Sequence, residues 1–430
     1  MTRKRYIDSP GIAADFDLVK DKLPGAVVLG EARQFAYDIF TDSGLPGPKV
    51  EEWKYSNLTK LAGRSFSIAG RTDGSAGEIP PLPSVARLVF VNGFFSAVRS
   101  SLTDLEGVTL CPLSAAPEEK LALFADLEDE DSLSALNKAM FTDGYFLEVS
   151  DGVQLPDVIE IVYQAEEHAD QTALRTRNLI LLGRDARAEL VETFSGAAGP
   201  AYWTQNISHI RLAERASLVS HTLQQEGSKA VHMNRKTVDL AAEASFQNYS
   251  LQAGAELSRT EIFPVLRGEQ ASVTLKGAYL ARDGQSQDIF TRMDHAEGHC
   301  ESEQIFRGVV DKGGKTAFQG KVIVEQDAQK TNADQSCKNL LLDRQAQANA
   351  KPELLIFADD VKCSHGATVG ELDETALFYL ESRGLAPADA RALLVEAFLA
   401  EVFEDVENEQ LRDTFQGRIR HWLVQSGVKS

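Results

Sequence analysis

The stretch Ala186-Arg187-Ala188-Glu189-Leu190 decides the fold, because its pattern of a small-residue turn leading into a short β-prone run returns along the chain. It recurs at Arg215-Ala216-Ser217-Leu218, Glu243-Ala244-Ser245-Phe246, Gln270-Ala271-Ser272-Val273 and Lys315-Thr316-Ala317-Phe318. The first four copies lie about 27–30 residues apart, a period that is typical of stacked solenoid coils. Since the runs are short, the period favours a β-helix. A sandwich or barrel with strands every ~8–12 residues is the alternative from the pattern alone.

The β-prone texture extends over residues 146–370, which we predict to form the β-helix core. Within it, Phe318, Gly320, Val322 and Val324 alternate with residues of the opposite face, a period close to two. Residues 1–145 are predicted to form a mixed and partly helical N-terminal region, and residues 371–430 a helical C-terminal domain. The sequence therefore predicts a mainly β protein with helical regions on both sides of a solenoid.

An acidic run at residues 126–131 precedes a helix predicted over Ser132–Met140, with Ser132 as its N-cap and Gly144 just past its end. Acidic residues at a helix start are favoured by the helix dipole, so we predict that the run is a solvated segment. A partner site is the alternative interpretation.

Three helices are predicted in the C-terminal region. The first covers Asp373–Arg383 and ends at Gly384, the second begins with Pro387 in its first turn, and the third covers Leu411–Val424. The second helix carries an apolar stripe, interpreted as core packing with partner docking as the alternative. The stripe comprises Ala390, Leu393, Leu394, Ala397, Phe398 and Val402.

Composition excludes several classes of protein. The 44 Lys and Arg residues against 64 Asp and Glu give a net charge of -20, which argues against binding to nucleic acid or anionic lipid. Apolar runs reach only about five residues, far short of the ~20 that a membrane-spanning helix needs. The four scattered cysteines form no C-x-x-C pair, which favours reduced thiols and a cytoplasmic location.

Three motifs suggest chemistry but lack a required feature. Gly313-Gly314-Lys315-Thr316 resembles the end of a phosphate loop, but Val309 stands where the first glycine is needed, so we expect no nucleotide hydrolysis. His295, His299 and Cys300 lie close together in the sequence. On an extended segment, however, His295 and His299 would be too far apart to share one metal. A carbohydrate-active enzyme with a β-helix fold would place catalytic acidic residues on one exposed face. Aspartate is also common in turns, so the same residues can be purely structural. The acidic candidates are Asp283, Asp288 and Asp294.

The segment Asp359-Asp360-Val361-Lys362-Cys363-Ser364-His365-Gly366-Ala367 follows the apolar run Leu354–Ala358, which is interpreted as a buried strand. Cys363 and His365 alternate by two, so they share a side of an extended segment. A thiolate and an imidazole suit iron or zinc, but two ligands do not hold a metal alone. A Cys-His hydrolytic dyad and a purely structural turn are the other interpretations.

This segment, extended to Gly370, resembles the signature of the SufB/SufD family of iron–sulfur cluster assembly proteins. The resemblance continues downstream through Leu377–Gly384 and upstream to Glu51-Glu52-Trp53-Lys54-Tyr55, so that it covers essentially the whole chain. The Cys-Ser-His-Gly form is SufD-like, whereas SufB members typically have Cys-Glu-His-Glu there. The closely spaced cysteines of SufB are also absent.

The resemblance implies a right-handed parallel β-helix and a non-enzymatic subunit that pairs with SufB and docks the ATPase SufC. It implies that iron or a nascent cluster binds transiently at the SufB–SufD interface, with His365 as a ligand and Cys363 as its neighbour. The family complex is also linked to reduced flavin, and no cofactor is expected to bind this chain tightly on its own. A homodimer is conceivable when SufB is absent. The implied SufC contacts are Leu377, Phe378, Tyr379, Arg383 and Phe398.

Two other functions remain as alternatives to an assembly subunit. One is a SufB-like scaffold that binds a cluster alone, which the cysteine count opposes. The other is the carbohydrate-active β-helix enzyme, which a screen of the isolated protein for activity would detect.

Overall fold

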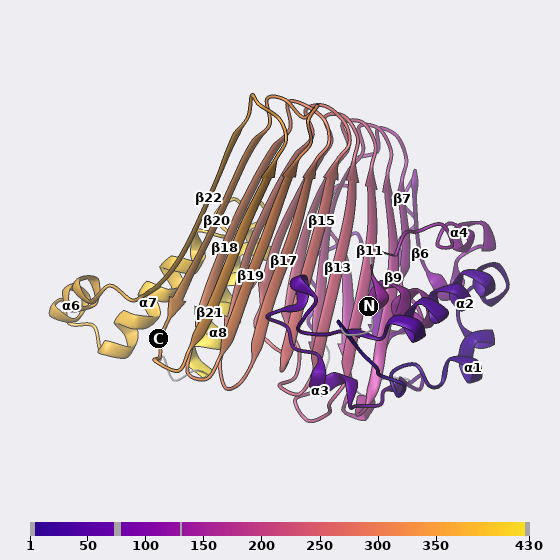
Figure 1. Cartoon of the computed structure of the whole chain (residues 1–430), viewed down its shortest axis with the longest axis horizontal. Helices are drawn as coiled ribbons and strands as arrows, with labels where there is room; N and C mark the ends of the chain where they lie inside the picture. Colours follow the sequence, from indigo (N-terminus) through magenta and orange to yellow (C-terminus); the bar gives the residue numbers. More distant parts are fainter. Residues whose placement is uncertain (1–4, 73–78, 130, 426–430) are drawn as a thin grey trace.

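Two sheets of stacked strands form the centre of the molecule (Figure 1). In the computed structural model, which describes residues 5–72, 79–129 and 131–425, strands alternate between the two sheets along the chain. Each coil therefore contributes one strand to each sheet, and all consecutive pairs from β7 onward within a sheet are parallel. The predicted parallel β-helix between helical regions is confirmed.

Sheet I has the order β22-β20-β18-β16-β14-β12-β10-β8-β4-β5, and sheet II has the order β21-β19-β17-β15-β13-β11-β9-β7-β6. The strands of sheet I are β4 (Ala86–Val91), β5 (Phe94–Phe95), β8 (Ile159–Ala165), β10 (Arg187–Gly196), β12 (Ser217–Gln225), β14 (Ser245–Gln252), β16 (Ser272–Ala281), β18 (Glu301–Val310), β20 (Asn332–Leu341) and β22 (Lys362–Glu371). The strands of sheet II are β6 (Val108–Pro112), β7 (Tyr145–Val149), β9 (Thr172–Leu182), β11 (Trp203–Leu212), β13 (Val231–Leu240), β15 (Leu257–Leu266), β17 (Ser286–His295), β19 (Lys315–Val324) and β21 (Gln347–Ile356), with β3 (Ser67–Ile68) beside β9. The short strands β1 (Tyr6–Ile7) and β2 (Leu45–Pro46) pair with each other.

The six corners before strands β10 to β20 of sheet I share one backbone conformation. One residue per corner has a φ between 57° and 63°, and its N–H donates to a corner carbonyl of the next coil, as from Asp185 to Glu214 at 3.1 Å. The residue that follows is small and buried, so that the chain turns tightly into the lumen. The left-handed residues are Asp185, Arg215, Glu243, Gln270, His299 and Lys330. The small residues after them are Ala186, Ala216, Ala244, Ala271, Cys300 and Thr331.

The repeat found in the sequence is therefore this ladder of corners, with one correction. Lys315–Phe318 starts β19 in sheet II, so it is not the fifth copy. The fifth copy is His299-Cys300-Glu301-Ser302, which precedes and begins β18. The fifth copy was assigned wrongly because strands of both sheets show the same period-two alternation of residues. In addition, the true corner has a cysteine where the first four copies have an alanine.

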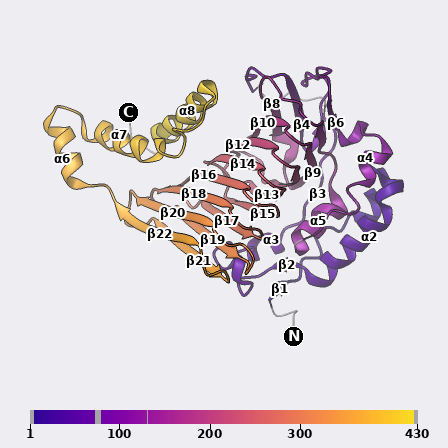
Figure 2. The same cartoon turned by 90° about the horizontal axis from the view of Figure 1, so that it is seen from above.

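The helical regions cover opposite outer faces of the solenoid (Figure 2). The N-terminal region packs on sheet II, where Leu133 and Leu136 of α5 share an apolar cluster with Trp203 and Met233. Its helices are α1 (Phe16–Val19), η2 (Lys20–Lys22), α2 (Ala26–Ser43), η3 (Glu51–Trp53), α3 (Thr59–Ala62), η4 (Leu113–Ala115), α4 (Glu118–Ala122) and α5 (Ser132–Met140), and η5 (Glu167–Ala169) lies between β8 and β9.

The C-terminal helices α7 (Pro387–Ala400) and α8 (Glu409–Gln425) pack on sheet I and bury Leu399 and Trp422 there. Arg307 of sheet I pairs with Glu401 at 2.8 Å, and Lys276 pairs with Asp405. Helix α6 (Glu374–Ser382) stands away from the solenoid, and none of its residues, all of which are described, is buried (Figure 1). None of the described helices is long and apolar enough to cross a membrane.

The start of α5 differs from the prediction. The N-cap is Asp131, whose carboxylate accepts from the N–H groups of Leu133 and Ser134, and the C-cap is Phe141 rather than a residue beside Gly144. The preceding run is solvated only in part: Asp126 and Glu128 are exposed as predicted, but Arg177 and Arg235 are buried on sheet II and need countercharges. Asp129 pairs with Arg177 at 3.1 Å, and Asp131 pairs with Arg235 at 2.7 Å. Residue 130 of the run lies outside the described residues.

The predicted stripe on α7 is wrong in part. Leu393 is 46% exposed, while the buried face of the helix carries Ala392, Val395 and Leu399 beside Ala390. The sequence misled because α7 has apolar residues on two neighbouring faces, so helical spacing alone could not choose between them. The predicted bounds of all three C-terminal helices agree with the structure within about two residues.

The corner ladder makes a prediction about stability. Ala244 is fully buried in its corner, so Ala244→Leu should lower the free energy of unfolding by roughly 1–3 kcal/mol through overpacking. The adjacent exposed Glu243 has a φ of 57°, which glycine adopts without strain, so Glu243→Gly should not destabilise the protein. Urea unfolding of both variants tests this, and an Ala244→Leu protein as stable as the unaltered chain would contradict it.

Candidate functional site

Cys363 and His365 lie on β22, the last strand of sheet I. In the register between β20 and β22, Cys363 lies beside Ala333 and His365 beside Gln335. Ala333 and Gln335 are 3% and 1% exposed and lie on the inward face of their strand. The two candidate ligands therefore continue one inward column into the last coil, on the shared side that the alternation predicts.

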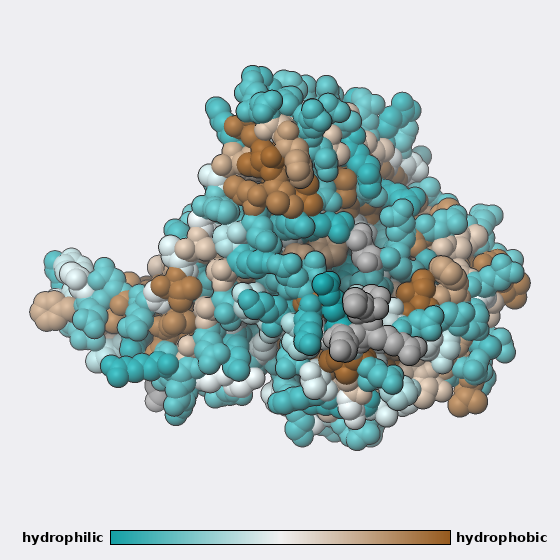
Figure 3. All heavy atoms as spheres, viewed as in Figure 1, coloured by the Kyte–Doolittle hydropathy of each residue, from teal (hydrophilic) through white to brown (hydrophobic). Residues whose placement is uncertain are grey.

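This last coil is uncovered. Beyond β21 and β22, no further strand of the described part of the chain pairs with either sheet. As a result His365 is exposed and Cys363 only half-buried against the core, although both point inward. Leu355 and Phe357 at the end of β21 are 41% and 60% exposed, and Figure 3 shows an apolar patch over this end of the solenoid. The expected buried strand at Leu354–Ala358 is thus an end strand.

The opposite end of the solenoid is closed. There β5 pairs antiparallel with β4 in sheet I, and β6 pairs antiparallel with β7 in sheet II. The turn between β4 and β5 is Asn92-Gly93, with φ values of 50° and 82°. Among the described residues, the free edges of parallel strands therefore lie at the end that carries His365.

The polar groups around the two ligands have structural partners. Asp360 pairs with Lys330 of the neighbouring corner, and Ser364 on the outward side of β22 pairs with Asp334. Partial burial raises the pKa of the Cys363 thiol, so the free side chain is protonated at neutral pH. Within the described residues, no three His, Cys, Asp or Glu side chains are grouped so that they could hold a metal ion. A metal at His365 and Cys363 therefore needs ligands from another molecule.

The second histidine and cysteine cluster of the sequence does not converge. His295 is buried in the lumen, where its Nε2 lies 2.9 Å from Ser302 Oγ and burial lowers its pKa to about 4. His299 is exposed at the left-handed corner, and Cys300 is the small residue that follows it. These residues belong to the corner ladder rather than to a metal site.

The three aspartates also lie apart in their surroundings. Asp283 is exposed at a corner with a φ of 52°, and Asp294 lies 3.2 Å from Arg292. Asp288 is buried outside sheet II, where it pairs with Arg259 and Ser56. They form no shared acidic surface.

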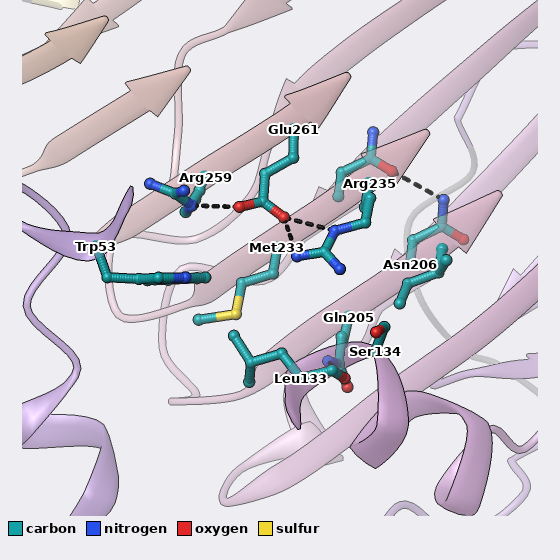
Figure 4. Close-up of a pocket in the computed structure, with 11 residues that line it drawn as sticks. Trp53, Leu133, Ser134, Gln205, Asn206, Met233, Arg235, Arg259 and Glu261 are labelled. Atoms are coloured by element: carbon teal, nitrogen blue, oxygen red, sulfur yellow. Dashed lines mark hydrogen bonds and ion pairs between the residues drawn. The ribbon is translucent and has the colours of Figure 1, made fainter. Parts of the chain in front are cut away.

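A buried network of ion pairs attaches the N-terminal region to sheet II (Figure 4). Glu261 lies between Arg235 and Arg259, and the guanidinium of Arg259 lies 4.0 Å from the centre of the Trp53 ring. Burial alone would raise the pKa of Asp131, but its pairing with Arg235 holds that pKa below the usual range. The cavity among these side chains measures about 20 Å³, room for about one water, so the network is a structural clamp.

Sequence reasoning missed this clamp. Its signal was the pair of opposite charges Arg259 and Glu261, separated by Thr260, which places both on the same face of one strand.

The candidate docking residues occupy two places. Phe378 and Tyr379 on α6 are 72% and 56% exposed, and Arg383 donates to the Tyr379 hydroxyl at 3.2 Å while Leu377 is half-buried. Phe398 instead lies on α7 and packs partly against the cluster between that helix and sheet I.

With this geometry in place, the comparisons with known proteins are informative. Residues 163–398 match the family model described as SUF system FeS cluster assembly, SufBD core domain. Residues 17–161 match the model described as SufBD protein N-terminal region. This chain belongs to the SufBD family. The family that the Cys363–His365 segment predicted is thereby confirmed.

Individual relatives agree with this placement. An iron–sulfur cluster assembly SufBD family protein of Synechocystis is 30% identical over 91% of this chain and 90% of its own length. The iron–sulfur cluster assembly protein SufD of Escherichia coli is 29% identical over 88% of this chain and 89% of its own length. The iron–sulfur cluster assembly protein SufB of Bacillus subtilis is 25% identical over 63% and 58%. The similarity to the SufD relative is thus the more extensive.

The buried His295 predicts a specific pH dependence of stability. Its pKa of about 4 in the folded chain lies below the ordinary ~6.5, so the unfolded state takes up a proton first as the pH falls. The free energy of unfolding should fall by about 3 kcal/mol between pH 6.5 and pH 4 through this group. Urea unfolding should show a smaller loss in His295→Gln over the same range. The exposed His299→Gln is the control, and equal pH profiles of all three proteins would refute the assignment.

Proposed function

We propose that this chain is the SufD-like subunit of an iron–sulfur assembly complex, in which it pairs with a SufB-type chain and docks a SufC-type ATPase. In this role the chain is a non-enzymatic partner in the cytoplasm, and iron or nascent cluster is its cargo. One observation carries the proposal. The free parallel edges and the two inward ligands, His365 and Cys363, occur at the same uncovered end of the solenoid.

The free edge supports pairing with a related solenoid. Strand β22 presents unpaired N–H and C=O groups along ten residues, and such an edge is a template for another strand. Exposed Ile356 and Val369, 40% and 48% accessible, would be covered by the added coil. In the absence of a SufB-type chain, the same edge could accept a second copy of this chain.

The ligand set supports a shared cargo site. The His365 imidazole is accessible and is the first donor, because the Cys363 thiol must lose a proton before it can bind a metal. Thiolates of the SufB-type chain would complete the coordination of iron. In this arrangement neither chain needs to hold the cluster when it is alone.

Helix α6 supports docking of the ATPase. This chain carries no complete phosphate loop of its own, so ATP hydrolysis must come from a partner. Phe378 and Tyr379 are exposed aromatic residues on a helix that stands away from the solenoid, and aromatic side chains are common anchors of protein interfaces.

The cargo role of His365 can be tested in the complex. We expect His365→Ala, co-expressed with the SufB-type and SufC-type proteins of the same source and purified without air, to lose most of its iron and sulfide. Ser364→Ala removes a side chain from the outward side of the same strand and should keep both. Complexes of equal stoichiometry in which His365→Ala retains full cluster would contradict the ligand assignment. Failure of the unaltered chain to form any complex would contradict the proposed function itself.

Docking through α6 makes a separate prediction. Phe378→Ala with Tyr379→Ala should weaken binding of the SufC-type ATPase by at least tenfold in calorimetry while leaving pairing with the SufB-type chain intact. Val98→Ala is the control, because Val98 is 94% exposed near the opposite end of the solenoid. Equal affinity of the double variant and the control would place the ATPase elsewhere.

A further inference from the structure

Two glutamines lie beneath His365 in the inward column. Gln335 of β20 is paired in register with His365, and Gln304 of β18 is paired with Gln335. Both are buried, with 1% and 0% of their surface exposed. One coil deeper the corresponding residue is Leu275, so the two glutamines stand consecutively between this leucine and the last coil.

The hydrogen bonding of these amides is incomplete. Thr291 donates to Oε1 of Gln304 at 2.7 Å, while Nε2 of Gln304 has no partner among the described residues. Within that same part of the chain, neither Oε1 nor Nε2 of Gln335 has a partner. A buried amide without hydrogen bonds is costly, so the Gln335 side chain requires a polar neighbour.

Gly320 fixes where the Gln335 side chain lies. A Cβ on Gly320 would collide with Nε2 of Gln335 and lie 2.7 Å from its Cδ. The amide therefore crosses the lumen and rests on the backbone of β19 in the space that the glycine leaves. In the register of sheet I, Gln335 lies beside the last coil, where the exposed imidazole of His365 occupies the adjoining position.

We propose that Gln335 is a positioning residue for His365. For this role its carbonyl oxygen, which has no partner among the described residues, turns to accept a hydrogen bond from one ring N–H of the imidazole, which leaves the other ring nitrogen unprotonated and directed toward the open end. A histidine that binds a metal commonly donates its other ring N–H to such a carbonyl, which sets its tautomer and orientation. The inference rests on the proposed role of His365 in binding iron.

The tautomer of His365 tests this in the isolated full-length chain. Nitrogen-15 NMR of histidine-labelled protein, at a pH where the imidazole is neutral, gives the tautomer ratio, and the loss of signals in His365→Ala assigns them. We expect one tautomer to dominate, and Gln335→Leu to move the ratio to that of an unstructured peptide of the same local sequence. Gly320→Ala should act in the same direction by displacing the amide, whereas Gln335→Glu keeps an acceptor and should preserve the skewed ratio.

Gln304→Leu is the matched control, because it removes a buried amide from the same column two coils away from His365. It should leave the tautomer ratio unchanged. A ratio in the unaltered protein equal to that of the peptide, or one that Gln335→Leu does not move, would overturn the proposal. The measurement uses neither iron nor a partner, so its failure is distinguishable from retention of cluster by His365→Ala in the complex.

Discussion

A coil of parallel strands needs a neighbour on each side, and the last coil of this chain has one on only one side. Along the stack, each strand is paired at both edges and each corner N–H finds a carbonyl of the next coil. Strand β22 (Lys362–Glu371) is the last strand of sheet I. The backbone groups on its outer edge are therefore unpaired, and its inward side chains are uncovered on one side. This interruption distinguishes His365, since the same column is buried in the coils beneath it.

The outer faces of both sheets and the other end of the solenoid are occupied by other parts of the chain. The outer face of sheet II is covered by the N-terminal region, which the Trp53–Arg259–Glu261–Arg235 clamp attaches. The outer face of sheet I is covered by α7 and α8. Antiparallel strands close the other end. The open coil and the projecting helix α6 are covered by neither region, and the two proposed contacts use these two features.

Much of the fold could be predicted from the sequence because solenoids are locally determined. The small residue after each corner and the period-two alternation repeat in the sequence as they repeat in space. The same regularity caused the errors. Lys315–Phe318 fits the pattern but belongs to the opposite sheet, and Leu354–Ala358 reads as buried because its composition matches strands that have a coil on both sides.

The candidate site could be predicted only in part. The alternation places Cys363 and His365 on one side, but exposure depends on whether another coil follows, which no local pattern encodes. The charge clamp was missed for a related reason. Asp131 looks solvated in sequence, and only the fold brings Arg235, about a hundred residues away in the chain, against it. Gln335 carried no signal of its own until the register placed it beside His365.

The open coil is proposed to be the pairing surface. Amide hydrogen exchange tests this when it is measured on the isolated chain and on its complex with the SufB-type and SufC-type partners. The backbone amides on the free edge of β22 should exchange quickly in the isolated chain and slowly in the complex. Amides of β12, paired at both edges, should be unchanged. Protection that appears instead over β5 and β6, with β22 exchanging equally fast in both samples, would contradict the account.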